Sequence, residues 1–377
     1  MTKRRSGRPS SAKRKEAARE FFRAKNQYGI YSESELALQL RRLPASRYLI
    51  DGLLQRRSVN ILVGDSGIGK SALVYQLALA VATGKPFLGL PVYHGKVILV
   101  DYENSLWDAH HILQQQRKYF GLDSIPNTLQ LWPMNQAAPG TPRFQLIQQG
   151  LHEEVEEVID PFAPDLLIFD SLRSFNPAME NDNTAAAKQI KQLRAISQGR
   201  GTAILLVHHV RKHGLKKSIE NAAHLEDSAP LDWLTRSAGS RALINQTDAR
   251  LAISNRKKAG DTLVLRGHLR TYGEVGPYLI ERIWDDSGEP LAYQRFEATP
   301  EMLENPDQEA AFEKLPDAFS FTEARLLYGK RHQATLEFLQ KLIRLGLARK
   351  TARGQYQREK TTPNGGFCPQ VDVSSAA

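Results

Sequence analysis

The chain has 377 residues, of which 24% are charged and 41% hydrophobic. This length and composition exclude a disordered or fibrous chain and allow two or three folded domains. No run of residues approaches the roughly 18 apolar positions of a membrane-spanning helix, and the first residues lack the apolar core of a secretory signal. The single cysteine, Cys368, excludes a disulfide framework and a thiolate-rich metal site. We therefore expect a cytoplasmic protein without a membrane partner.

The net charge of +10 is concentrated in two segments of the chain. Residues 1–25 hold ten Lys and Arg against two Glu, and residues 321–358 hold nine against two. The intervening residues 26–320 carry a net charge of −4. Because clustered Lys and Arg attract polyanions, these two basic segments are the parts expected to meet a nucleic acid.

The first basic segment is predicted to be a flexible arm over residues 1–27, because it is rich in Ser, Lys and Arg and poor in apolar residues. It contains an Arg-Arg-Ser-Gly-Arg-Pro run in which Ser6 stands where a minor-groove hook carries arginine. Nonspecific contact with phosphates is therefore favoured over reading of A·T base pairs. Residues 32–40 then predict a short amphipathic helix with a serine N-cap.

Five runs of apolar, often β-branched residues follow, and stretches with helical spacing separate several of them. The predicted strands cover residues 59–63, 97–100, 166–169, 203–207 and 250–254, and the predicted helices cover 71–82 and 184–198. Continuous apolar strands between helices are typical of a sheet that is buried on both faces. The sequence therefore predicts a mostly parallel α/β domain, which we bound at residues 28–300.

The residues after the first of these strands fit a phosphate-binding loop. They are Gly64, Asp65, Ser66, Gly67, Ile68, Gly69, Lys70 and Ser71, which satisfy every position of G-x-x-x-x-G-K-[ST]. In such a loop backbone N–H groups close around the phosphate, and the lysine neutralises the β and γ oxygens. The hydroxyl of Ser71 would ligate magnesium. The sequence predicts a site for ATP and Mg2+.

Two other predicted strands end in carboxylates that suit ATP hydrolysis. Asp170 follows the apolar run 166–169 and is the predicted acidic ligand of the metal. Since Ser171 rather than a second carboxylate comes next, the base that activates water must come from elsewhere. Glu103, just beyond the strand at 97–100, is the residue that we select for that role.

The strand at 203–207 ends in a pair of histidines, His208 and His209. Adjacent strand residues face opposite ways and do not easily ligate one metal ion together. We therefore expect a neutral imidazole, that of His209, to contact the γ-phosphate.

After residue 299 the alternation of strands and helices stops. Helical patterns cover 306–315, 321–328 behind Thr322 as N-cap, and 332–345, and a hairpin pattern covers 347–358. Three helices and a basic hairpin predict a winged helix-turn-helix over residues 306–360, followed by a disordered tail at 361–377.

The basic residues of this predicted module indicate contact with duplex DNA. Its third helix would present Arg331, Lys341 and Arg344, and its hairpin would bring Arg349, Lys350 and Arg353 to phosphates. Winged helices also bind proteins, so a docking role is the alternative.

With these motifs in this order, the chain resembles RecA-fold ATPases of the group that contains the hexameric RepA-type replicative helicases of plasmids. It resembles the DnaB-type helicases more distantly. The resemblance spans roughly residues 45–295 and rests on the phosphate loop and on residues 100–103, 167–173, 207–210 and 238–243. It implies that Glu103 is catalytic and that His209 senses the γ-phosphate.

The resemblance also implies an arginine that reaches the nucleotide of a neighbouring subunit. Family members commonly carry Arg-Gly-Ser where this chain has Ala238, Gly239 and Ser240. The candidate substitutes are Arg236, Arg241 and Arg270, each of which is alternatively an ordinary surface arginine. In related ring-shaped motors, loops in a central pore grip single-stranded DNA. The polar connection at 211–237 would supply such a loop through Lys212, Lys216 and Lys217, or it is a surface loop without this function.

These features predict an ATP-driven DNA translocase or helicase of plasmid, phage or mobile-element replication. It is expected to form a homo-oligomer, specifically a hexameric ring. The alternative is an ATP-switched DNA-binding or recruitment factor, such as a helicase loader or a recombination or partition accessory protein. Tight binding to a specific duplex sequence without unwinding would favour the alternative.

Overall fold

The computed structural model describes most of the chain and divides it into two units, Met1–Arg47 and Tyr48–Ala377. The described residues are 29–41, 46–136, 146–147, 150–151, 153–210, 224–238, 240–256 and 262–359, with a few positions between 16 and 27. Most of the predicted basic arm, the connection at 211–223 and the tail at 361–377 lie outside the described residues.

The first unit contains the helix that the sequence predicts. Helix α2 (Glu33–Leu40) begins after Ser32, whose hydroxyl accepts a hydrogen bond from the backbone N–H of Glu35. The carboxylate of Glu35 accepts one in return from the backbone N–H of Ser32 at 2.6 Å. This reciprocal capping box satisfies two N–H groups that the helix itself leaves without partners.

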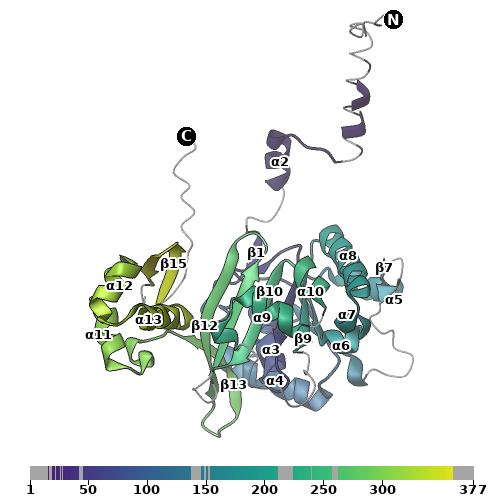
Figure 1. Cartoon of the computed structure of the whole chain (residues 1–377). Helices are drawn as coiled ribbons and strands as arrows, with labels where there is room; N and C mark the ends of the chain where they lie inside the picture. The colour runs from purple at the N-terminus through teal and green to yellow at the C-terminus, as the bar shows by residue number, and fades with distance from the viewer. Residues whose placement is uncertain are drawn as a thin grey trace, which may run out of the picture. The chain divides into compact units, whose positions relative to one another are not determined.

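The second unit is built on one sheet of nine strands, in the order β13-β12-β11-β10-β3-β9-β8-β4-β5 (Figure 1). The parallel strands are β3 (Val59–Gly64), β4 (Val97–Asp101), β5 (Leu129–Pro133), β8 (Leu166–Asp170), β9 (Ala203–His209) and β10 (Ala249–Asn255). The antiparallel strands are β11 (Leu263–Leu269), β12 (Gly273–Trp284) and β13 (Pro290–Phe296). The predicted mostly parallel sheet is confirmed. The sequence patterns predicted neither the parallel strand β5 nor the three antiparallel strands.

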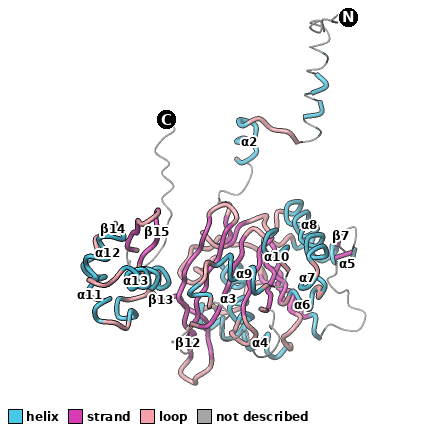
Figure 2. The backbone as a smooth tube through the Cα atoms, viewed as in Figure 1, coloured by secondary structure: helices cyan, strands magenta, loops and turns pink. Residues whose placement is uncertain are grey.

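Helices cover both faces of this sheet (Figure 2). They are α3 (Lys70–Thr83), α4 (Leu106–Phe120), α5 (Glu153–Phe162), α6 (Leu172–Phe175), α7 (Ala178–Asn181), α8 (Asn183–Arg200), α9 (Pro230–Ser237) and α10 (Arg241–Gln246). Short elements complete the unit: β1 (Tyr48–Ile50), β2 (Leu54–Gln55), β6 (Leu146–Ile147), β7 (Gly150–Leu151), η1 (Met134–Gln136) and η2 (Leu225–Asp227).

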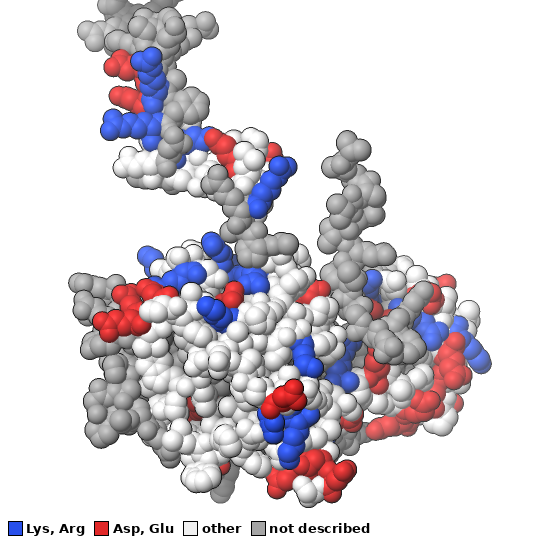
Figure 3. Space-filling model, turned by 180° about the vertical axis from the view of Figure 1, so that it is seen from behind, with Lys and Arg blue, Asp and Glu red and all other residues white. Residues whose placement is uncertain are grey.

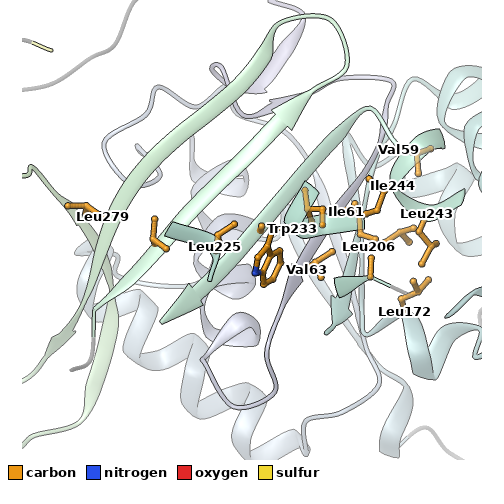
Figure 4. Close-up of a cluster of buried hydrophobic side chains, with 14 of the residues drawn as sticks. Val59, Ile61, Val63, Leu172, Leu206, Leu225, Trp233, Leu243, Ile244 and Leu279 are labelled. Carbon is orange, nitrogen blue, oxygen red and sulfur yellow. The ribbon is translucent and has the colours of Figure 1, made fainter. Parts of the chain in front are cut away.

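The central strand β3 is buried along its whole length and contributes side chains to two hydrophobic clusters. Val59, Ile61 and Val63 pack with residues of α8, α9 and α10, as Figure 4 shows for part of this cluster. Leu62 points the other way and packs with α3. Because successive strand residues face opposite sides, this one buried strand supplies apolar side chains to both layers of the core.

Helix α3 is apolar around most of its circumference, and eleven of its 14 residues are buried. It lies against the sheet and contacts both α4 and β13. A helix with apolar residues on all sides is expected where neighbours surround it. These contacts hold α3, which begins at Lys70, in place against the sheet.

The C-terminal part of the second unit contains the predicted three helices and hairpin. The elements are η3 (Pro300–Leu303), α11 (Pro306–Lys314), β14 (Ala318–Ser320), α12 (Phe321–Tyr328), α13 (His332–Leu345), β15 (Ala348–Ala352) and β16 (Gln355–Arg358). The short strand β14 was not predicted, and it joins the hairpin in a three-stranded antiparallel sheet of order β14-β16-β15. Phe319, Phe338 and Tyr356 are buried in its core.

One prediction at this module is wrong, because Thr322 does not cap α12. Ser320 occupies the N-cap, and its hydroxyl accepts from the backbone N–H of Glu323 at 3.2 Å. The carboxylate of Glu323 accepts from the backbone N–H of Ser320 at 2.7 Å. The helix itself spans Phe321–Tyr328 as predicted, and only its cap differs, since β14 ends at Ser320 directly before it.

Within the described ranges, every helix is too short or too polar to cross a lipid bilayer.

We expect Ser320→Ala to lower the free energy of unfolding of the C-terminal module by about 1 kcal/mol, because α12 loses its capping hydrogen bonds. Urea denaturation measures this change. The exposed Thr322→Ala in the first turn of the same helix is the matched control and should change stability much less. Equal losses for the two variants would contradict this assignment of the cap.

Candidate nucleotide-binding site

The predicted phosphate loop connects β3 to α3, and two of its glycines are required for different reasons. A Cβ at Gly69 would lie 1.8 Å from the hydroxyl of Tyr293, and the residue has a φ of +90°. A Cβ at Gly64 would lie 2.6 Å from a methyl group of Ile253 on the neighbouring strand β10. Side chains larger than hydrogen would therefore displace the loop from the sheet.

The loop is supported from behind by the antiparallel strand β13. Tyr293 is buried, and its main-chain N–H and C=O both bind the side-chain amide of Gln76 on α3, at 2.9 and 2.7 Å. Arg282 of β12 donates to the hydroxyl of Tyr293 at 3.0 Å. No local pattern in the sequence pairs residues so far apart, and this support was missed.

Lys70 is buried and its ammonium group lies inside the curve of the loop. It donates to the main-chain carbonyls of Gly64 and Asp65, at 3.0 and 2.6 Å. Burial lowers the pKa of Lys70, while the nearby charges of Asp170 and Glu103 oppose this shift. An ammonium group held by two carbonyls can turn to a phosphate oxygen with a small movement of its side chain.

Asp170 is the buried carboxylate at the end of β8. Its Oδ2 atom is buried and has no hydrogen-bond partner. Burial raises the pKa of Asp170 to about 6, a hydrogen bond from Ser71 opposes the shift, and the charges of Asp101 and Glu103 add to it. A buried carboxylate oxygen without a partner is costly unless a cation binds it.

The residues at this position fit Mg2+. Asp170 offers the unpaired oxygen, and Ser71 offers a hydroxyl beside it. Mg2+ prefers oxygen ligands and commonly keeps water and phosphate oxygens in addition to one or two protein groups. The described residues contain no cluster of three or more His, Cys, Asp or Glu that could hold a metal by themselves. A magnesium ion shared with a nucleotide is therefore the arrangement that these donors suit.

Glu103 lies beside the loop, in the turn after β4. Its Oε1 accepts hydrogen bonds from Ser171 Oγ at 2.5 Å and from His209 Nε2 at 3.1 Å. The hydrogen bond from His209 is the main cause that lowers the pKa of Glu103 to about 2, with Ser171 and the charge of Lys70 in support. The carboxylate is therefore ionised over the whole neutral range.

His209 joins the phosphate loop to Glu103. Its Nδ1 lies 3.1 Å from Lys70 Nζ and 3.2 Å from Ser66 Oγ. Its Nε2 lies 3.1 Å from Glu103 Oε1. A lysine ammonium can only donate and a carboxylate can only accept. The neutral ring must therefore carry its proton on Nε2, which leaves Nδ1 as the acceptor.

His208 faces the opposite side of β9, as expected for the adjacent strand residue. Its Nε2 lies 2.9 Å from the carbonyl oxygen of Ala238, and its Nδ1 lies 3.6 Å from Glu180. Burial lowers the pKa of His208 to about 4. This ring thus connects β9 to the turn between α9 and α10 and takes no part in the phosphate loop.

The candidate arginines do not gather around Lys70 within one subunit. Arg236 and Arg241 are exposed, at the end of α9 and the start of α10. Arg270 lies 3.8 Å from Asp248, beside the amino end of β10. Since β10 runs parallel to β3, that end is roughly 15 Å along the strands from the phosphate loop.

The predicted DNA-binding residues lie in different surroundings. Lys212, Lys216 and Lys217 lie outside the described residues. Lys350 and Arg353 are exposed on the hairpin, and Arg349 there pairs with Glu359 at 3.1 Å. Arg331 is exposed at the N-cap of α13, and Arg344 is partly buried. The ammonium group of Lys341 donates to the main-chain carbonyl of Leu303.

Comparisons with known proteins found a family model and solved structures to which this chain is similar. The family model described as an AAA domain matches residues 31–214. Among solved structures, the crystal structure of the RadB recombinase is similar at 16% identity, covering 65% of this chain and 93% of that chain with a TM-score of 0.39. The expectation of a RecA-like P-loop ATPase is confirmed.

We expect Asp170→Asn to stabilise the protein without nucleotide or metal, because it removes a buried carboxylate that lacks a partner. The ordinary pKa of an aspartate is 3.8, so the carboxyl is protonated in both the folded and the unfolded state only well below that pH. Above about pH 6 the carboxyl is ionised in both states, and its burial then lowers the free energy of unfolding by the full amount. The gain in the free energy of unfolding should reach about 2 to 3 kcal/mol at pH 8 and be smaller at pH 5.

Urea denaturation in EDTA at both pH values measures this gain. Asp101→Asn is the matched control, since Asp101 is a buried carboxylate whose oxygens all have hydrogen-bond donors, and it should destabilise the protein. A less stable Asp170→Asn at pH 8 would contradict the interpretation of Asp170 as a buried carboxylate without a full set of partners.

Proposed function

We propose that the chain is an ATP-driven DNA translocase or helicase of the RepA type, which acts as a homo-oligomeric ring in plasmid, phage or mobile-element replication. The observation that carries the proposal is the set of contacts from Lys70 through His209 to Glu103. These contacts join the phosphate loop, the candidate base and the end of β9 in one site. The chain continues from β9 directly into the basic connection that holds Lys212.

In this proposal Lys70 and the loop N–H groups bind the β- and γ-phosphates of ATP, while Ser71 and Asp170 hold Mg2+. Bound Mg2+ neutralises negative charge that develops on the phosphate oxygens. Glu103 accepts the proton of the attacking water, because its carboxylate is ionised and lies beside the loop. The hydroxyl of Ser171 and the ring of His209 keep that carboxylate in place.

His209 would report the state of the γ-phosphate to the DNA-binding connection. A γ-phosphate oxygen competes with the ring of His209 for the ammonium group of Lys70, which lies 3.1 Å from Nδ1. Binding and hydrolysis therefore change the partners of this ring. His209 is the last residue of β9 and Lys212 follows three residues later, so this change of partners would occur next to the basic connection in sequence.

Assembly would complete the site with an arginine from a neighbouring subunit. Among the described residues, Lys70 and Arg282 bring positive charge to the phosphate loop within one chain, whereas Arg270 lies at the other end of the strands. Arg236 and Arg241 are exposed and can reach a neighbouring subunit. An arginine supplied in trans contributes a factor of 10³ to 10⁵ in rate in related phosphoryl-transfer enzymes, so hydrolysis would depend on ring formation.

The C-terminal module is, in this proposal, a winged helix that binds duplex DNA. Its helix order and its three-stranded sheet match that architecture, with β15 and β16 as the wing. On the face drawn in Figure 3, basic and acidic side chains lie in small separate groups rather than in one broad basic area. In this proposal the contacts with DNA come from a local cluster, the exposed Arg349, Lys350 and Arg353 of the hairpin.

One observation favours the alternative of a recruitment factor. Leu326 on α12 is 80% exposed, and its neighbour Leu327 is 36% exposed. Exposed leucines side by side are typical of a protein contact rather than a DNA contact. In that case the module would bind a partner protein, and ATP would switch the assembly without unwinding.

The test uses purified full-length protein with ATP and Mg2+, with Lys70→Ala as the inactive control. A helicase should hydrolyse ATP faster with single-stranded DNA, separate the strands of a forked duplex and form rings in negative-stain images. Hydrolysis without strand displacement, together with tight binding to one duplex sequence, would support the recruitment factor. Absence of DNA-stimulated hydrolysis would overturn the proposal.

We expect the triple variant Arg349→Ala, Lys350→Ala, Arg353→Ala to weaken duplex binding and to reduce its salt dependence. Each lost phosphate contact lowers the slope of log K against log salt by about 0.9, so the slope should fall by about 2 to 3. The double variant Lys188→Ala, Lys191→Ala on α8 removes exposed lysines elsewhere and is the control. An unchanged slope in the triple variant would exclude this hairpin from DNA binding.

A further inference from the structure

Asp101 is a second buried carboxylate at the edge of the sheet that bears the phosphate loop. It is the last residue of β4 and pairs in register with Asp170 on β8. The two carboxylates differ in their partners, because Asp170 has an oxygen without one, whereas both oxygens of Asp101 accept hydrogen bonds. Asp101 therefore has no oxygen left for a metal ion, and its carboxylate instead holds the groups that donate hydrogen bonds to it.

The donors to Asp101 come from the turn that carries Glu103 and from α3. Its Oδ1 accepts from the backbone N–H groups of Glu103 and Asn104, both at 2.9 Å. Its Oδ2 accepts from the side-chain amide of Asn104 at 2.7 Å and from the hydroxyl of Tyr75 at 2.5 Å. One carboxylate thus fixes the main chain at Glu103 itself and at the residue after it.

Tyr75 connects this turn to the helix that begins at the phosphate loop. It lies five residues after Lys70 on α3 and is completely buried. Burial, with the charge of Asp101 in second place, raises the pKa of Tyr75. Its hydroxyl therefore stays protonated and remains a donor to Asp101. The phosphate-binding helix and the turn that presents Glu103 are joined through this hydrogen bond.

We infer that Asp101 and Tyr75 are positioning residues that set the place of the Glu103 carboxylate for attack on ATP. The inference rests on the proposed role of Glu103 in hydrolysis. The backbone at Glu103 decides whether its carboxylate meets Ser171 and His209. A misplacement of about 1 Å can cost a factor of about 100 in rate, so a hydrogen bond that fixes this backbone contributes to turnover.

The experiment measures steady-state ATP hydrolysis by full-length wild type, Tyr75→Phe, Glu103→Gln and the double variant. Tyr75→Phe should lower kcat about 10-fold and leave the KM for ATP with Mg2+ within about twofold, because the phosphate loop is unchanged. In the Glu103→Gln background the same substitution should cause no further loss, since there is no carboxylate left to position. Tyr278→Phe, which alters another buried tyrosine on β12, is the control.

A purely structural role predicts another pattern, in which Tyr75→Phe lowers kcat by the same factor in both backgrounds. That result, or a wild-type kcat in Tyr75→Phe, would overturn the inference while leaving hydrolysis by Glu103 intact. If wild type does not hydrolyse ATP, or if Glu103→Gln hydrolyses it at the wild-type rate, the proposed role of Glu103 fails and the inference fails with it.

Asn104→Ala provides a second variant in case Tyr75→Phe does not fold. It removes the donor at 2.7 Å from Oδ2 of Asp101 while leaving the buried phenol in place. We expect a several-fold loss of kcat, an unchanged KM and again no loss in the Glu103→Gln background. Equal losses in both backgrounds would count against the inference here too.

Discussion

The register of four neighbouring parallel strands decides where the side chains of the nucleotide site lie. Gly64 of β3 lies beside His209 of β9, Val207 of β9 lies beside Asp170 of β8, and Asp170 lies beside Asp101 of β4. Parallel strands place their carboxyl ends on one edge, so polar residues from distant parts of the chain meet there. A shift of one residue in any pair would turn a carboxylate or imidazole to the opposite face.

Along this edge, the same burial has opposite consequences for neighbouring groups. Asp101 is buried with a full set of donors, so its burial strengthens the hydrogen bonds of the turn at Glu103. Asp170 is buried with one oxygen lacking a partner, which disfavours its ionised form. Asp101 therefore fixes the turn that carries Glu103, whereas Asp170 keeps an oxygen that would favour a cation.

The sequence predicted the features that depend on local pattern. The apolar runs located five of the six parallel strands, all except β5, and the phosphate loop was evident from eight consecutive residues. The opposite directions of His208 and His209 followed from strand geometry alone. Features that depend on distant contacts were missed, such as the support of Gly69 by Tyr293 and the hydrogen bond from Tyr75 to Asp101. The cap at Ser320 was missed because β14 has only three residues.

The support of the phosphate loop by β13 also bears on the order in which this protein can mature. The loop is complete in sequence at Ser71, but the strand that holds it, through Gln76 and Tyr293, is more than 200 residues further along the chain. During synthesis the loop therefore emerges long before its support. An unfinished chain would carry the phosphate-binding motif without its mature shape, so nucleotide binding in the final geometry belongs to the late stages of folding.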